Sequence, residues 1–85
     1  MTRNEIENKI LEIMKDEFEI ENPDLDDDLR EVHSFDSIDA IELLREIEIL
    51  LDSELTQNEK RQAMDIRTIS QVCDYVELMA QNRSN

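Results

Sequence analysis

The chain has 85 residues, with 23 acidic and 9 basic side chains, so its formal net charge at pH 7 is -14. A chain of this length predicts one small domain, residues 1–85, whose core is too limited for a deep active site. Its acidity excludes nucleic acid and anionic membrane surfaces as natural partners and favours basic protein surfaces.

The first predicted helix carries apolar residues at spacings of three and four, which places them on one face. These residues are Ile6, Ile10, Ile13, Met14 and Phe18. Thr2 and Glu5 form a capping-box pattern at its start. We expect the helix to end near Glu19, ahead of Pro23.

Residues 21–35 read as a long acidic loop, and a loop of this length in so small a domain is usually functional or held by apolar anchors. We expect Leu29 and Val32 to insert into the helical core. His33 is expected to be a surface residue of this loop, close enough to Asp36 to make loop order depend on pH, since histidine titrates near neutrality.

The acidic run at residues 24–28 resembles the start of a calcium loop. A calcium loop that begins at Asp24 needs a glycine at its sixth position and a glutamate at its twelfth. The chain has Leu29 and Phe35 there. We therefore predict a solvated loop and no specific metal site.

The second main helix is predicted to begin at Asp36 or Ser37 and to run to Leu51. Its apolar positions form two adjacent stripes, so the apolar arc is wide. The stripes are Ile38, Ile41, Leu44 and Leu51, and beside them Leu43, Ile47 and Leu50. Such a helix contacts the core on one side and leaves some apolar surface exposed elsewhere.

Two further helices complete an all-α bundle of four helices, three long and one short, with the long loop between the first two. Thr56 and Glu59 form a second capping box, which starts a short helix that ends near Met64. Thr68 is expected to cap the last helix. Its apolar stripe consists of Ile69, Val72, Cys73, Val76 and Met79. We expect the polar tail, residues 81–85, to fray.

Cys73 is the only cysteine, which excludes an internal disulfide and fits a reducing compartment. Its place on the apolar stripe predicts a core residue rather than a reactive one. No apolar run approaches the roughly 20 residues of a membrane span. The first residues also lack the apolar run of a signal peptide, so we expect a cytoplasmic protein.

Ser37 has three possible roles. Serine and aspartate both favour helix N-termini, so Ser37 could simply cap the helix. A catalytic serine needs a base within hydrogen-bond reach and an oxyanion hole, and the chain offers one histidine and no glycine. A phosphate ester on Ser37 would instead suit the free amides and positive dipole end of a helix N-terminus.

The chain resembles the acyl carrier proteins, which bear 4'-phosphopantetheine on the serine of an Asp-Ser-Leu motif. The matching residues are Asp36-Ser37-Ile38 with Asp39, then Ile41-Glu42-Leu43, and later Thr68-Ile69 and Asp74-Tyr75-Val76. Together with the long loop before the serine, the resemblance covers nearly all of the chain.

The resemblance implies that a phosphopantetheinyl transferase attaches the group from coenzyme A to Ser37. The protein would then carry acyl or aminoacyl groups as thioesters in fatty-acid, polyketide or lipid-modifying pathways, and would itself catalyse nothing. Acyl-loading and acyl-processing enzymes with basic patches would be its partners, and we expect a monomer. The implied docking residues are Asp36, Ile38, Asp39, Ile41, Glu42 and Glu48. The implied acyl-pocket residues are Leu43, Ile47, Ala63 and Ile66.

Several positions depart from the family's pattern and indicate a specialised carrier. Ser34 stands three residues before Ser37, where the family usually has glycine, and because serine resists a positive φ we expect altered loop geometry there. Arg45 replaces an exposed apolar residue, Ile49 replaces an acidic one, and the stretch 55–66 is longer than usual. The competing interpretation is an acidic helical interaction module without a prosthetic group.

Overall fold

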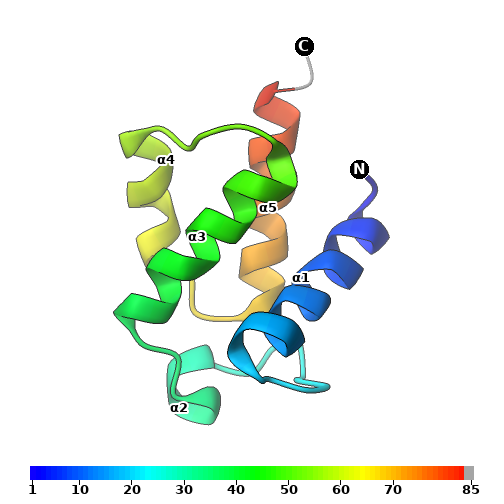
Figure 1. The fold of residues 1–85 in the computed structure, drawn as a ribbon, viewed down its shortest axis with the longest axis vertical. Helices are drawn as coiled ribbons and strands as arrows, with labels where there is room; N and C mark the ends of the chain where they lie inside the picture. The colour runs from blue at the N-terminus through cyan, green and yellow to red at the C-terminus, as the bar shows by residue number, and fades with distance from the viewer. Residues whose placement is uncertain (84–85) are drawn as a thin grey trace.

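The computed structural model describes residues 1–83 as a bundle of helices (Figure 1). The helices are α1 (Arg3–Phe18), α2 (Leu29–His33), α3 (Ser37–Leu51), α4 (Gln57–Gln62), the 3-10 turn η1 (Ala63–Asp65) and α5 (Ile69–Arg83). The all-α prediction is confirmed. The predicted boundaries of the long helices are also close to those observed, and α2 is an additional helix within the segment predicted as loop.

Local capping explains where the helices begin. Thr2 and Glu5 bond each other reciprocally, with the Glu5 amide donating to Thr2 Oγ1 at 3.2 Å and the Thr2 amide donating to Glu5 Oε1 at 3.1 Å. Thr56 and Glu59 repeat this arrangement at 3.1 and 2.9 Å. The hydroxyl of Thr68 accepts an amide of the first turn of α5 at 3.1 Å. These caps confirm the predictions, because each depends only on residues three apart.

The core lies where α1 and α3 pack against α5. All five residues of the predicted α5 stripe are completely buried, as are three residues of the α1 stripe. The completely buried residues are Ile6, Ile10, Met14, Ile47, Ile69, Val72, Cys73, Val76 and Met79. Burial of these side chains supplies the main driving force for folding.

The segment between α1 and α3 is fastened to the start of α5. The Leu29 amide donates to the Arg67 carbonyl, and the Ser70 amide donates to the Leu25 carbonyl, each at 2.9 Å. The Phe35 ring also meets the Phe18 ring edge to face, with ring centres 5.2 Å apart. These contacts fix the path of the chain as it enters α3.

The prediction that Val32 inserts into the core is wrong, whereas the prediction for Leu29 is confirmed. Leu29 is buried, but 57% of Val32 is exposed. Asp28 caps a single helical turn, α2, which lies at one end of the bundle (Figure 1). In a turn placed there, a residue that faces away from the bundle, such as Val32, stays exposed.

The prediction that the tail frays from residue 81 is also wrong for residues 81–83. α5 continues to Arg83, whose guanidinium binds the carboxylate of Glu59. The long-range ion pair holds the last turn in place, which a pattern of polar residues does not reveal. Ser84 and Asn85, for which fraying was also predicted, lie outside the described residues.

The chain has no glycine, and non-glycine residues take the left-handed conformation that ends its helices. Glu19, Ser34 and Asp52 follow α1, α2 and α3 with φ of 57°, 55° and 52°. The expectation that Ser34 would avoid a positive φ is therefore wrong. Its amide donates to the Leu29 carbonyl and closes α2, and this helix-ending geometry holds serine in a conformation that glycine adopts more easily.

None of the helices within residues 1–83 combines the length and the apolar character that a membrane-spanning helix needs.

Candidate functional site

Ser37 is the first residue of α3 and is exposed, but it does not cap the helix. Asp36 has that role, since its Oδ1 accepts the amides of Ile38 at 3.0 Å and Asp39 at 2.9 Å. The Asp36 amide in turn donates to Asp39 Oδ2 at 3.1 Å. The Ser37 hydroxyl has no hydrogen-bond partner among residues 1–83, so the capping role considered for Ser37 is wrong.

The only histidine does not serve Ser37 as a base. His33 is the last residue of α2, and its Nε2 lies 3.2 Å from Asp27 Oδ2. Only 18% of its side chain is exposed, so His33 is partly buried against Asp27 and is not the free surface residue that was predicted. A nucleophilic serine needs a base that bonds its hydroxyl. Within the described residues, the arrangement at Ser37 offers none.

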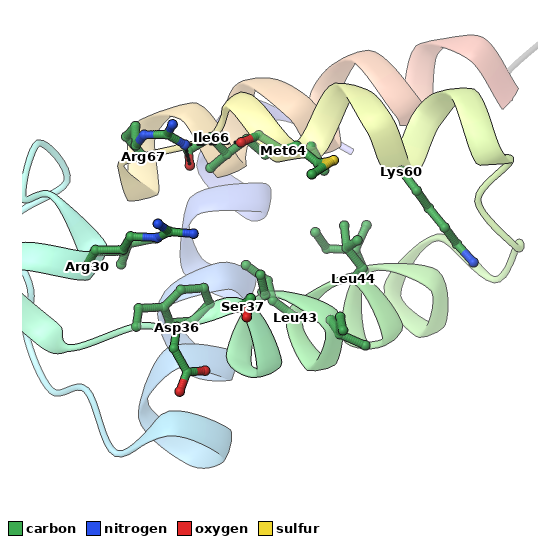
Figure 2. Close-up of a pocket in the computed structure, with 15 residues that line it drawn as sticks. Arg30, Asp36, Ser37, Leu43, Leu44, Lys60, Met64, Ile66 and Arg67 are labelled. Atoms are coloured by element: carbon green, nitrogen blue, oxygen red, sulfur yellow. Dashed lines mark hydrogen bonds between the residues drawn. The ribbon is translucent and has the colours of Figure 1, made fainter.

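A cavity of about 320 Å³ opens beside Ser37, between α3 and the segment that contains α4 and η1 (Figure 2). All four residues implied as an acyl pocket, Leu43, Ile47, Ala63 and Ile66, line it. Six further apolar residues were not predicted. They are Leu29, Phe35, Ala40, Ile41, Leu44 and Met64. A volume of this size is within the range that holds a small organic ligand.

The exposed face of α3 carries apolar and acidic side chains together. Ile38 is 73% exposed and Ile41 is 62% exposed, and Glu42 is exposed beside them. Asp39 is half-buried, and its carboxylate is bound to the Asp36 amide. The face can therefore contact an apolar surface that is rimmed by positive charge.

Glu48 has a structural partner. Its Oε2 accepts the Leu55 amide at 2.8 Å, which ties α3 to the loop before α4. This bond occupies one oxygen of the carboxylate. Glu48 therefore differs from Glu42, for which no hydrogen bond or ion pair is found within residues 1–83.

A model of the family described as "Phosphopantetheine attachment site" matches residues 8–76, and this span includes Ser37 and the cavity. The chain belongs to this family of carrier proteins. A search of curated proteins and a search of solved structures found no match. Members of the family bind 4'-phosphopantetheine covalently, and as carriers they interact with phosphopantetheinyl transferases and acyl-processing enzymes.

The residues of this carrier fit such a group. Attachment needs an exposed hydroxyl, and the Ser37 hydroxyl is exposed and free of intramolecular hydrogen bonds within the described part of the chain. The phosphate of the group is an anion, and the N-terminus of a 15-residue helix such as α3 favours negative charge. The apolar cavity lies directly beside this position.

The carrier's α4, which forms one wall of the cavity, is held by Glu59. Arg83 binds the Glu59 carboxylate, and the Tyr75 hydroxyl donates to the Glu59 carbonyl at 2.7 Å. The bond from Arg83 holds the pKa of Glu59 at about 2, and burial raises the pKa of Tyr75 to about 12. No residue of α4 is buried, so these polar contacts are an important part of what keeps the wall in place.

Cys73 is completely buried in the core, as predicted, and burial raises the pKa of its thiol to about 11. The acidic run 24–28 bonds to itself, with the Asp24 amide donating to Asp27 Oδ2 and the Asp26 amide to Asp24 Oδ1. Within residues 1–83, no group of three His, Cys, Asp or Glu side chains is arranged to hold a metal ion.

Proposed function

We propose that Ser37 carries the 4'-phosphopantetheine group of this protein. The observation that supports this assignment is the division of roles at the start of α3. Asp36 caps the helix, so the adjacent serine hydroxyl is left exposed and unbonded beside an apolar cavity. A phosphopantetheinyl transferase would transfer the group from coenzyme A, forming a phosphodiester at Ser37 Oγ and releasing the adenosine 3',5'-bisphosphate portion.

The attached group supplies a thiol that holds an acyl or aminoacyl intermediate as a thioester. The chain's own part is to keep the anchor on a rigid helix, to offer partial shelter in the cavity, and to present the cargo to enzymes that dock. Tethering maintains a high local concentration of cargo for each docked enzyme.

The proposed docking surface is the exposed face of α3 that contains Asp36, Ile38, Asp39, Ile41 and Glu42. Its two isoleucines supply apolar contact, and its carboxylates steer basic patches of partner enzymes toward it. Among the carboxylates of the implied docking residues, only that of Glu42 makes no bond within residues 1–83, since those of Asp36, Asp39 and Glu48 each accept backbone amides. We also propose that residues 1–85 act as one monomeric domain in the cytoplasm.

Intact-mass measurement tests the assignment. The unmodified protein is incubated with coenzyme A and a broad-specificity phosphopantetheinyl transferase, and we expect a gain of one phosphopantetheine. Ser37→Ala is expected to show no gain, whereas Ser70→Ala, a serine of α5, keeps it. Modification of Ser37→Ala would overturn the assignment. Absence of modification with several transferases would favour the interaction module without a prosthetic group.

A further inference from the structure

The cavity beside Ser37 is lined by more positive than negative side chains, unlike the rest of this protein. Arg30, Lys60 and Arg67 line it, and Asp36 is the only acidic residue that does. The chain has 9 basic and 23 acidic residues, so a third of its basic residues lie around one cavity. The Asp36 carboxylate is moreover engaged by the amides of α3. The cavity is therefore a local site of positive charge.

These cations are not neutralised by acidic partners. Arg3 and Arg83 bind carboxylates, but within residues 1–83 the side chains of Arg30 and Lys60 have no ion pair or hydrogen bond. Arg67 uses one guanidinium nitrogen, Nη1, for the carbonyls of Met64 and Ile66, each at 3.1 Å. All three guanidinium and ammonium groups therefore remain available to an anion.

The cations are distributed along the cavity. In Figure 2, Arg30 extends into the cavity from the end where Ser37 lies, and Arg67 faces it from the other wall. Lys60 lies at the opposite end, beyond Leu44 (Figure 2). An anion held at Ser37, such as the phosphate of the arm, lies near the first end only. Lys60 is placed for an anionic group farther along the cavity.

We propose, on the basis of the carrier function proposed above, that this cavity selects acyl groups that end in a carboxylate over acyl groups that end in a neutral or ammonium group. The apolar walls, with residues such as Leu43 and Ile47, receive the methylene groups of the chain. The terminal carboxylate pairs with Lys60, while Arg30 and Arg67 add attraction. A terminal ammonium would meet three like charges, and because all three side chains are exposed, both effects are largest at low ionic strength.

Three cargoes of similar size test the proposal: glutaryl, its terminal amide, and 5-aminopentanoyl. Each is attached to Ser37 by a phosphopantetheinyl transferase from the corresponding acyl-coenzyme A analogue, in which a stable amide replaces the thioester, and intact mass verifies loading. The melting temperature of each loaded protein is then measured at low ionic strength. We expect the glutaryl form to melt roughly 3 to 6 °C above the aminopentanoyl form, with the amide between them.

Neighbouring basic residues supply a matched pair of variants. Lys60→Gln is expected to remove most of the difference between the glutaryl and amide forms. Arg61→Gln makes the same change of charge one residue along α4, at an exposed position outside the cavity lining, and is expected to preserve the difference. Amide chemical shifts of Ala63 and Ile66 provide a second readout, and they should move most with glutaryl.

Each remaining outcome overturns the proposal. Equal melting temperatures for the three cargoes would do so, as would a difference that survives Lys60→Gln, Arg30→Gln and Arg67→Gln. If these variants instead lower the melting temperature of the protein whose arm carries no acyl group by the same amount, the cations bind the phosphate of the arm and not the cargo. Failure to load Ser37 appears in the mass spectrum, and it contradicts the carrier assignment and this inference together.

Discussion

The guanidinium of Arg83 holds the carboxylate of Glu59 through two nitrogens, with Nη1 2.9 Å from Oε2 and Nη2 2.7 Å from Oε1. This paired geometry is stronger and more specific than a single contact between opposite charges. It joins the last turn of α5 to the first turn of α4. The ion pair therefore supports a cavity wall that has little apolar anchorage of its own.

The pair makes stability depend on pH in the acidic range. The pKa of Glu59 is about 2 in the folded protein and 4.5 ordinarily, so between these values the unfolded chain binds a proton that the folded chain does not. The stabilisation is complete above pH 4.5 and is lost as the pH falls toward 2. Glu59→Gln keeps a capping side chain but loses the charge. We expect it to cost about 1 to 3 kcal/mol at pH 7.

Urea unfolding of the wild type and Glu59→Gln at neutral pH and near pH 3 measures this effect. The difference in free energy of unfolding should shrink on acidification. Glu12→Gln, a change of the same type at an exposed position of α1, serves as the control and should have little effect at either pH. A difference that is the same at both pH values would show that the ion pair is not responsible.

Ser34→Gly is expected to stabilise the protein by about 0.5 to 1 kcal/mol. The left-handed conformation costs an L-residue roughly 1 to 2 kcal/mol, and the greater entropy of glycine in the unfolded chain offsets part of the gain. Chemical denaturation measures the change. Ser70→Gly, inside α5, should instead destabilise by about 0.5 to 1 kcal/mol. Destabilisation by both substitutions would contradict the account of Ser34.

Cys73 is expected to react very slowly with thiol reagents in the folded protein. Its side chain is inaccessible and its pKa of about 11 leaves little thiolate at pH 8. We predict a rate at least roughly a hundredfold below that in urea, because reaction requires opening of the core. After phosphopantetheine attachment, one thiol should react rapidly, and this reaction should be absent in Ser37→Ala. Rapid labelling of the unmodified protein would contradict the prediction.

Glu42→Lys is expected to slow modification by a phosphopantetheinyl transferase about two- to tenfold at low salt, and to weaken the dependence of the rate on salt. Glu42 tests the docking surface better than Asp39, since the Asp39 carboxylate also takes part in the cap of α3. Glu12→Lys changes the net charge equally but lies on α1, and should leave the rate nearly unaltered. Equal effects of the two variants would indicate that overall charge, not the α3 surface, steers the encounter.

Features that depend on neighbouring residues could be predicted from the sequence. The caps at Thr2, Thr56 and Thr68 require side chains only a few positions apart, and the α5 stripe follows from helical periodicity. These parts of the fold were predicted correctly. Six of the ten apolar cavity residues were missed, but Leu43, Ile47, Ala63 and Ile66 were implied by the family resemblance.

Features that join distant segments could not be predicted in this way. Arg83 is one of several polar residues at the end of the chain, and nothing local indicates that it binds Glu59. The basic residues of the cavity come from α2, α4 and the segment before α5, so no single stretch of sequence contains their arrangement. The prediction for Val32 is wrong because the segment was expected to be a loop, whereas Asp28 begins a helical turn there.

The backbone bonds from Leu29 to Arg67 and from Ser70 to Leu25 have a consequence for the newly synthesised chain. They connect the segment before Ser37 with residues 67–70, which leave the ribosome later. Until α5 has emerged and docked, the segment before α3 lacks the hydrogen-bond partners that fix its path. Contacts between residues this far apart in the sequence form late in folding. The carrier should therefore become a substrate for its transferase only after α5 has been synthesised and has docked.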